Sequence, residues 1–185
     1  MAVLMSLWLP ILVAAIVVFV ASSIMHMVLP YHKSDYKKLP EEEKALAVLR
    51  SAGLTPGQYV FPYCTHKEMN TAETQAKLKA GPVGMMYVRP SGPVQMGKFL
   101  GMWFFFCLVV GVFVAYLTGH TVDPGAHYLK VFRVAGTAAF LTYGLGNLSN
   151  GIWKGQPWGV TIKEVIDGLI YGLLTAGVFG WLWPR

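Results

Sequence analysis

Polar and ionisable residues stand at helical spacing inside otherwise apolar stretches of this 185-residue chain. Residues three, four or seven positions apart fall on one face of an α-helix, so their side chains can meet. Together with a histidine near the end of the first stretch, the set is His26, Tyr143, Asn147, Asn150, Glu164, Asp167 and Tyr171. Ionisable groups are costly to bury in lipid, and this cluster is therefore a candidate proton or substrate relay.

Two plainer interpretations of the same cluster stay open. Asp167 could pair with Lys163, one helical turn away, or extend toward the membrane surface, while Asn147 and Asn150 cap a helix end. The cluster could also contact a partner protein. The residue types and spacing do not choose among a relay, a structural role and a partner contact.

A second group of possible ligands is His120, Asp123 and His127, which lie within eight residues of one another. Imidazole and carboxylate groups bind zinc or copper, although this spacing matches no tight metal motif. The Asp123-Pro-Gly125 segment is typical of a turn, which favours a turn flanked by histidines over a metal site. Met25-His26-Met27 offers soft ligands, but neighbouring helical residues point in different directions and cannot share one ion.

Other cofactors and catalytic sets find little support. A haem between helices would need a histidine facing His26 across the bundle, and the apolar stretches contain none. Cys64 and Cys107 form no C-x-x-C pair, and no nucleophile elbow or glycine-rich phosphate loop is present. We therefore predict no cofactor and favour a protein that is not an enzyme, and a membrane enzyme that uses His120, Asp123 and His127 stays open as a third alternative.

The elements that carry these residues follow from the distribution of charge. The chain is 55% hydrophobic and only 13% charged, against about 25% in soluble proteins. Residues 1–32, 99–122, 134–153 and 168–184 lack Asp, Glu, Lys and Arg. About 20 apolar helical residues cross a bilayer. The predicted fold is therefore an all-α membrane protein with a bundle of four transmembrane helices, at 1–29, 99–119, 131–150 and 162–185.

The segment between the first two predicted spans, residues 30–98, reads as a small α+β unit. Pro40 followed by three glutamates favours a helix from 39 to 53. A capping-box pattern at Thr65 and Glu68 favours a second helix from 65 to Gly81. Short strands are predicted at 59–61 and 85–88, with their pairing left open. The remaining segments, 120–130 and 151–161, are predicted loops.

Orientation follows from the basic residues. Twelve of the fifteen lysines and arginines lie in residues 30–98 and 151–163, and such residues concentrate on the cytoplasmic side. We therefore expect residues 30–98 in the cytoplasm, both termini outside, and a location in a bacterial inner membrane. Because these basic residues flank the spans, the net charge of +6 indicates lipid contact and not nucleic-acid binding.

Small residues four positions apart let helices approach closely in lipid. The pairs at Gly97 and Gly101 and at Gly168 and Gly172 are of this kind. They favour packing inside one bundle, and docking against another membrane subunit or a second copy is the alternative.

The stretch IMHMVLPYHKSDYKKLP at 24–40 and the ending DGLIYGLLTAGVFGWLWPR at 167–185 resemble a family of small bacterial inner-membrane proteins. The resemblance covers nearly the whole chain and implies an envelope location and a small polytopic protein. It carries no activity, and no functional residues come with it.

Two functions are compatible with these observations. The first expectation is a non-enzymatic structural or accessory component of a membrane assembly. The alternative is a small transporter or proton-coupled channel that works through the polar cluster around Asp167.

Overall fold

The computed structural model describes residues 5–184 and divides into two compact units. Unit 1 comprises residues 1–35, 95–151 and 156–185. Unit 2 comprises residues 36–94 and 152–155. Each unit is described by itself.

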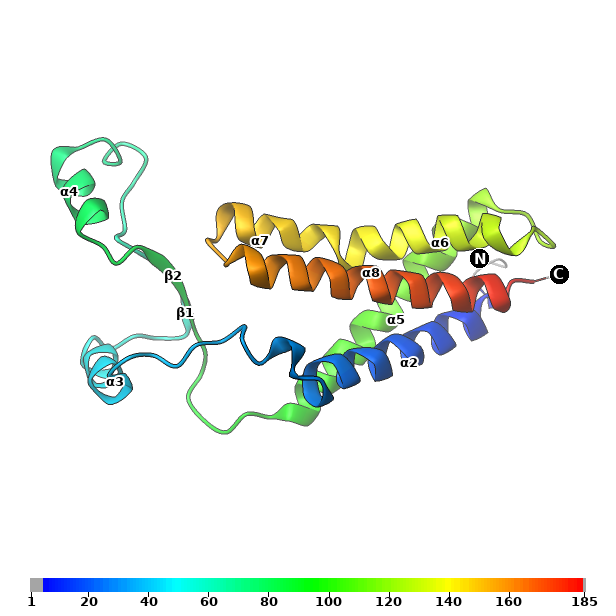
Figure 1. Cartoon of the computed structure of the whole chain (residues 1–185), viewed down its shortest axis with the longest axis horizontal. Helices are drawn as coiled ribbons and strands as arrows, with labels where there is room; N and C mark the ends of the chain where they lie inside the picture. The colour runs from blue at the N-terminus through cyan, green and yellow to red at the C-terminus, as the bar shows by residue number, and fades with distance from the viewer. Residues whose placement is uncertain (1–4, 185) are drawn as a thin grey trace. The chain divides into compact units, whose positions relative to one another are not determined.

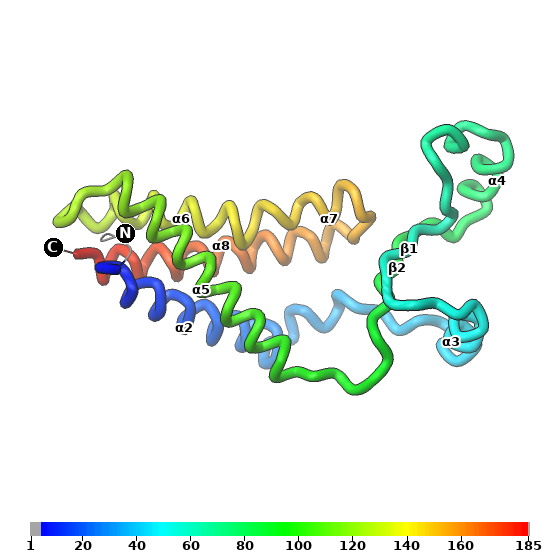
Figure 2. The backbone as a smooth tube through the Cα atoms, turned by 180° about the vertical axis from the view of Figure 1, so that it is seen from behind, coloured from blue at the N-terminus to red at the C-terminus, as the bar shows by residue number. Residues whose placement is uncertain are grey.

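Unit 1 is a bundle of helices (Figure 1). Its elements are α2 (Trp8–Ser23), a π-helix (Ile24–Val28), a 3₁₀-helix (Pro30–His32), α5 (Met96–Thr121), α6 (Tyr128–Tyr143), a second 3₁₀-helix (Leu145–Asn147), the start of α7 (Leu148–Trp153), and α8 (Trp158–Trp181). Helices α6 and α8 lie side by side, and α2 contacts both α5 and α8 (Figure 2). A continuous apolar interior results.

The bundle interior is built from small and β-branched side chains that allow close helix packing. Helices α2, α5, α6 and α8 contribute to it through buried residues, among them Ala14, Val18, Cys107, Val114, Val131, Ala135, Ala139 and Phe179. Glycines let α6 and α8 come closest. A Cβ built on Gly172 would lie 3.1 Å from the Cβ of Phe140, and one on Gly136 would lie 2.9 Å from the Cβ of Ala176. The Gly168–Gly172 pair therefore allows close helix packing inside the bundle. A Cβ built on Gly97 or Gly101 would meet no atom within 4 Å.

Unit 2 contains two short helices and one hairpin-like sheet. Helix α3 covers Glu42–Ser51 and α4 covers Ala72–Ala80, while β1 (Gly57–Phe61) pairs antiparallel with β2 (Gly84–Val88). The expected strands thus exist and pair. The second helix begins later than predicted, because Thr65 and Glu68 close only a local turn, and Thr71 accepts the capping bond from Thr74 N. A glycine at positive φ, Gly81, ends α4.

The prediction of four transmembrane helices is wrong. Within residues 5–184, two helical segments are long and apolar enough to cross a membrane: Trp8–Val28, with 21 residues, and Met96–Thr121, with 26 residues. The predicted span at 131–150 is broken at Gly144, so that α6 has 16 residues and is about 24 Å long at 1.5 Å per residue. Helix α8 is long enough, but its first three turns carry Lys163, Glu164 and Asp167.

Candidate functional site

The end of the first apolar helix changes its winding just before it reaches the polar segment. Residues Ile24–Val28 form a π-helix, in which Leu29 N donates to Ile24 O, and Pro30 then starts a 3₁₀ turn. A π-turn inserts one extra residue into a helix and often accompanies a functional site. Here it carries His26, while the following turn carries His32, and the two imidazole rings stack with centroids 4.0 Å apart.

Both histidines approach one carboxylate from α8. His32 Nε2 lies 3.0 Å from Asp167 Oδ2, and His26 Nε2 lies 4.0 Å from the same oxygen. His26, His32 and Asp167 are hereafter the His–Asp centre. Within the described residues they form the one group of three metal-binding side chains whose ligand atoms all lie within 4.8 Å of one another.

The opposite nitrogen of each ring is held by a second group. His26 Nδ1 lies 3.2 Å from the carbonyl oxygen of Ser22, and His32 Nδ1 lies 2.6 Å from Asp35 Oδ2. A carbonyl oxygen and an ionised carboxylate can only accept hydrogen bonds. The Nδ1 atom of each histidine is therefore the donor and carries the ring hydrogen. In the neutral rings, each Nε2 therefore presents a lone pair toward Asp167.

Lys163 fixes the turn that carries His32. Its ammonium donates to Asp35 Oδ1 at 2.6 Å, to Ser34 Oγ at 2.9 Å and to the carbonyl oxygen of Tyr31 at 2.8 Å. Burial alone would raise the pKa of Asp35, but the hydrogen bonds from Lys163 and His32 outweigh it and hold that pKa below its ordinary value. Asp35 is therefore a carboxylate at neutral pH.

Several buried polar atoms at the centre lack a hydrogen-bond partner among the described residues. They include His32 Nε2 and both carboxylate oxygens of Asp167, together with Glu164 Oε2 and the Tyr171 hydroxyl. The 3.0 Å separation of His32 Nε2 from Asp167 Oδ2 is an ion-pair distance, yet these atoms form no hydrogen bond. Orphaned buried groups are rare, and a cluster of them points to a bound species.

The centre opens into a pocket of about 220 Å³ within unit 1. Its lining residues are His26, Trp103, Phe106, Thr142, Tyr143, Asn147, Glu164, Asp167 and Tyr171. Trp103 Nε1 donates to Ser22 Oγ at 2.8 Å, which links α5 to the end of α2. The rings of Tyr143, Tyr171 and Trp103 pack against one another with centroids 5.7–6.3 Å apart. The pocket thus has aromatic walls and an ionisable end.

Known proteins give no guide to this site. The chain matches no protein-family model, no curated protein and no solved structure.

Most of the residues singled out in the sequence surround this pocket. His26, Tyr143, Asn147, Glu164, Asp167 and Tyr171 line it, and Asn150 does not. Asp167 meets histidines and not Lys163, which pairs with Asp35 instead. Sequence reasoning missed His32, Asp35 and Lys163 as members of the site. The signal that could have indicated His32 and Asp35 is the short polar run directly after Pro30. A chain that turns at this proline brings both side chains back toward the end of the first helix.

The other candidate ligands do not converge. His120 Nδ1 bonds the carbonyl oxygen of Tyr116, and His127 Nδ1 accepts from Leu129 N as the cap of α6. Asp123 offers its backbone carbonyl to Trp183 Nε1 at 3.0 Å. Within the described residues, His120, Asp123 and His127 do not form a metal-binding group. Their geometry is that of a helix end followed by a turn.

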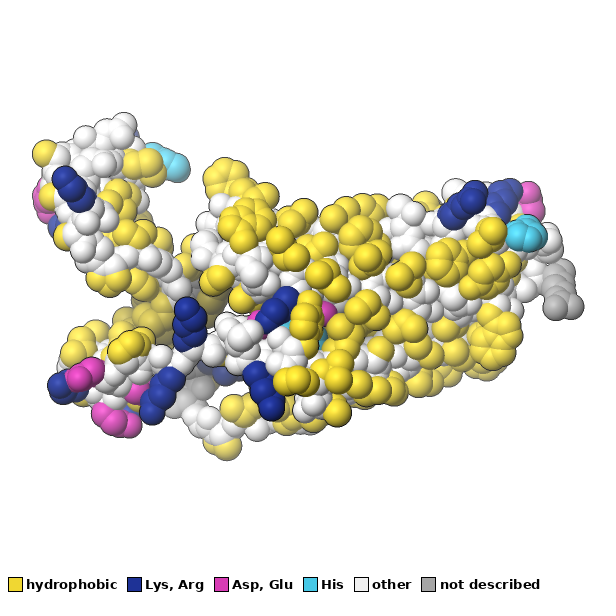
Figure 3. Space-filling view, viewed as in Figure 1, with side chains coloured by type: hydrophobic (Ala, Val, Ile, Leu, Met, Phe, Trp, Pro, Cys, Tyr) yellow, Lys and Arg dark blue, Asp and Glu magenta, His cyan; other side chains and the backbone are white. Residues whose placement is uncertain are grey.

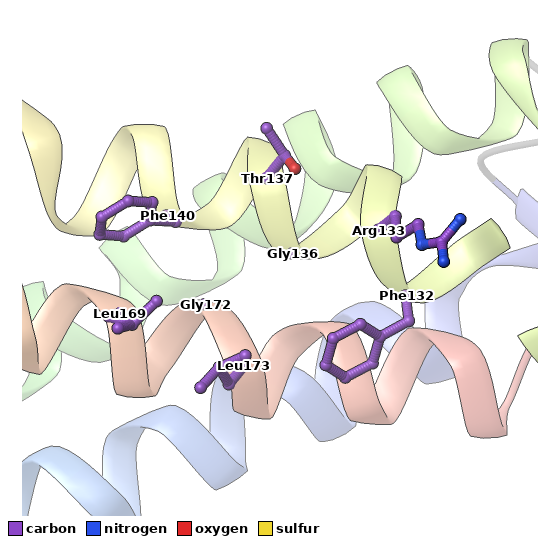
Figure 4. Close-up of a pocket in the computed structure, with 8 residues that line it drawn as sticks. All are labelled: Phe132, Arg133, Gly136, Thr137, Phe140, Leu169, Gly172 and Leu173. Carbon is purple, nitrogen blue, oxygen red and sulfur yellow. The ribbon is translucent and has the colours of Figure 1, made fainter. Parts of the chain in front are cut away.

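A further groove of about 280 Å³ lies along α6 and α8 (Figure 4). Its lining is Phe132, Arg133, Gly136, Thr137, Phe140, Leu169, Gly172 and Leu173. Figure 4 shows the Arg133 guanidinium directed away from the Phe140 end of this groove. A largely apolar lining with one cation has no set of converging polar atoms comparable to the His–Asp centre.

Proposed function

We propose that the protein is a membrane-anchored component whose functional site is a cation-binding centre at His26, His32 and Asp167. Membrane attachment is supported by the two long apolar helical segments and by large apolar side chains exposed on them (Figure 3). These include Trp8, Ile16, Val20, Met102, Phe105, Phe113 and Tyr116. A soluble monomer seldom exposes so much contiguous apolar surface.

The proposed location is a bacterial inner membrane with residues 30–98 on the cytoplasmic side and both termini outside. The concentration of Lys and Arg in that segment supports this orientation. Under this proposal, His32, Asp35 and Lys163 lie at the cytoplasmic boundary, where a cation from the cytoplasm reaches them.

One observation carries the binding function: the Nε2 atoms of His26 and His32 face the Asp167 carboxylate, and His32 Nε2 and both carboxylate oxygens lack a hydrogen-bond partner. When both rings are neutral and Asp167 is ionised, the two imidazole lone pairs and the carboxylate repel one another in a poorly hydrated place. The side chain of Asp167 is only 4% exposed, so water screens this repulsion little. A cation between the three groups removes the repulsion and supplies the missing partner. Uptake or transfer of a cation is therefore the function that this geometry supports best.

The binding function predicts a cation-dependent stability that Asp167→Asn abolishes. Purified wild-type protein in detergent should gain thermal stability from at least one cation in a panel of Na⁺, K⁺, Mg²⁺, Ca²⁺, Mn²⁺ and Zn²⁺. The gain should reach about 2.7 kcal/mol at a concentration 100 times the Kd. The nearly isosteric Asp167→Asn side chain removes the negative charge, so this variant should not respond. Thermal unfolding followed by circular dichroism measures both.

Glu73→Gln is the matched control, since it neutralises an exposed carboxylate that pairs with Lys77 far from the centre in sequence. This variant should respond to the same cation as the wild type. A wild-type protein that no cation stabilises, or equal responses of wild type and Asp167→Asn, would remove the proposal. Extraction of native membranes at alkaline pH tests the anchoring separately, with the chain expected in the pellet.

A second candidate is an accessory role in a larger membrane assembly, as first expected from the sequence. It is favoured by the start of α5, where Gly97 and Gly101 face no side chain within 4 Å although their spacing suits close helix contact. Gly101→Leu should then release a co-purifying membrane protein from mildly solubilised native membranes. Gly159→Leu is the control, because it adds the same side chain at an open site on α8, and it should leave the co-purifying protein bound. Gly111→Leu cannot serve as the control, because Ile11 lies against that glycine inside the bundle. A wild-type chain that elutes alone as a monomer of 20.4 kDa plus detergent would count against this role.

A further inference from the structure

We propose that the cation is a divalent transition metal ion of the zinc class, bound by His26 Nε2, His32 Nε2 and the carboxylate of Asp167. This inference rests on the proposed function, since it names the chemical class of the species held at the same centre. Four features of the site carry it: ligand distances, ring orientation, ligand type and charge.

The ligand atoms are near enough to share one ion. Zinc binds imidazole nitrogen and carboxylate oxygen at about 2.0–2.2 Å, so two ligands at a tetrahedral angle are about 3.4 Å apart. His32 Nε2 lies 3.0 Å from Asp167 Oδ2, close to this separation, and His26 Nε2 lies 4.0 Å from the same oxygen, somewhat farther than it. The widest separation in the group, at most 4.8 Å, closes with a small rotation of His26. That side chain is 49% exposed and has room to rotate.

Each histidine is oriented as metal-bound histidines are. A ligating imidazole almost always donates its other N–H to a carboxylate or a backbone carbonyl, which fixes the ring and raises its basicity. His32 donates to Asp35 and His26 donates to the carbonyl oxygen of Ser22. Asp35 is in turn held by Lys163 at 2.6 Å. The centre thus already has its supporting shell on both rings.

Ligand type separates the possible metals. Calcium and magnesium require oxygen ligands, and magnesium also keeps several waters. Two imidazoles and one carboxylate suit Zn²⁺, Co²⁺, Fe²⁺ or Ni²⁺. Sodium and potassium ions do not prefer nitrogen ligands, so two histidines would give no selectivity for them. The set therefore selects a transition metal.

The charge also fits a divalent ion. Two neutral imidazoles and one carboxylate contribute a single negative charge, while Asp35 and Lys163 offset each other. A divalent ion leaves one positive charge, which Glu164, with a buried and unpartnered oxygen at the same pocket, can balance. Three protein ligands leave a coordination position open, as in zinc sites that exchange water or substrate.

Cobalt reports directly on this geometry, because Co²⁺ replaces Zn²⁺ and absorbs visible light when bound by nitrogen and oxygen in a tetrahedral or five-coordinate site. The full-length protein in detergent, stripped with a chelator and dialysed, is titrated with Co²⁺ alone. We expect one equivalent of bound Co²⁺ per chain with visible absorption bands that excess Zn²⁺ abolishes. His32→Ala and Asp167→Asn should weaken binding by about 100-fold or more, and Asp35→Asn by about 10–100-fold.

His120→Ala is the matched control, because this histidine bonds a backbone carbonyl on a helix and lies outside the centre. It should bind Co²⁺ like the wild type. His26→Gln guards against misfolding, since the half-exposed side chain can change without disturbing the core, and it should lose the bands while keeping the wild-type circular dichroism spectrum.

The outcomes distinguish this inference from the proposal beneath it. Thermal stabilisation by Na⁺ or Mg²⁺ that depends on Asp167, together with no Co²⁺ absorption, would overturn the transition metal and leave the cation-binding centre standing. No response to any cation would overturn both. Co²⁺ bands that His120→Ala removes and His32→Ala leaves unchanged would place the metal elsewhere and refute the assignment.

Discussion

Gly168→Ala is expected to lower the free energy of unfolding by about 3 kcal/mol, the upper end of the usual cost of overfilling a packed interior. A Cβ at this position would lie 2.5 Å from the carbonyl carbon of Tyr143 and closer still to the backbone of Gly144. These are backbone atoms, which cannot turn aside as the end of a side chain can. Denaturant titration in mixed micelles, followed by circular dichroism, measures the loss.

Gly101→Ala is the control for this effect. It places the same methyl group on α5 where nothing lies within 4 Å. Because alanine favours helix more than glycine does, this variant should be neutral or more stable by up to about 1 kcal/mol. Equal losses at both glycines would show that α8 does not approach Gly144 as closely as described.

Lys163→Met is expected to destabilise unit 1 by about 3 kcal/mol, because it leaves a buried carboxylate without its ammonium partner. The Asp35 side chain is 7% exposed and that of Lys163 is 21% exposed, so neither charge is fully solvated. The same substitution removes the bonds to Ser34 and to the Tyr31 carbonyl, and the turn that carries His32 should loosen. Denaturant titration gives the stability, and hydrogen exchange of residues 30–35 reports on the turn.

A double-mutant cycle separates the ion pair from simple loss of packing. If the pair is coupled, Lys163→Met combined with Asp35→Asn should cost less than the sum of the two single changes. Lys77→Met supplies the control, since its partner Glu73 is exposed and such surface pairs contribute about 0–1 kcal/mol. Additive effects of the Lys163 and Asp35 substitutions would contradict the described contact.

The sequence predicted the two long apolar helices well, because a continuous apolar run of about 20 residues favours one uninterrupted helix. It did not predict the break in the third run, where Gly144 ends α6 and Asn147 Nδ2 then donates to the Tyr143 carbonyl oxygen. This break depends on one local side-chain hydrogen bond, which a mean hydropathy over the whole run does not reveal. The four-helix prediction failed at this point and at the charged start of α8.

The site was foreseen in part for a similar reason. The position of a residue along an apolar helix can be counted from the helix end. This count predicts that His26 and Asp167 lie at the same level of the bundle. The contacts of Lys163 with the 31–35 turn join residues 128–132 positions apart and depend on where an irregular segment folds back. The sequence has no periodic pattern that predicts where residues 31–35 fold back onto α8.

The π-turn at Ile24–Val28 makes the His–Asp centre sensitive to chain length as well as to residue identity. Its extra residue turns everything downstream by about 100°, one step of an α-helix. A deletion of one residue between Ser22 and Pro30 would relax the turn to a regular helix and carry His32 away from Asp167, with all three ligands still present. Insertions and deletions in this short stretch, and not substitutions alone, therefore separate chains that can form the centre from chains that only share its residues.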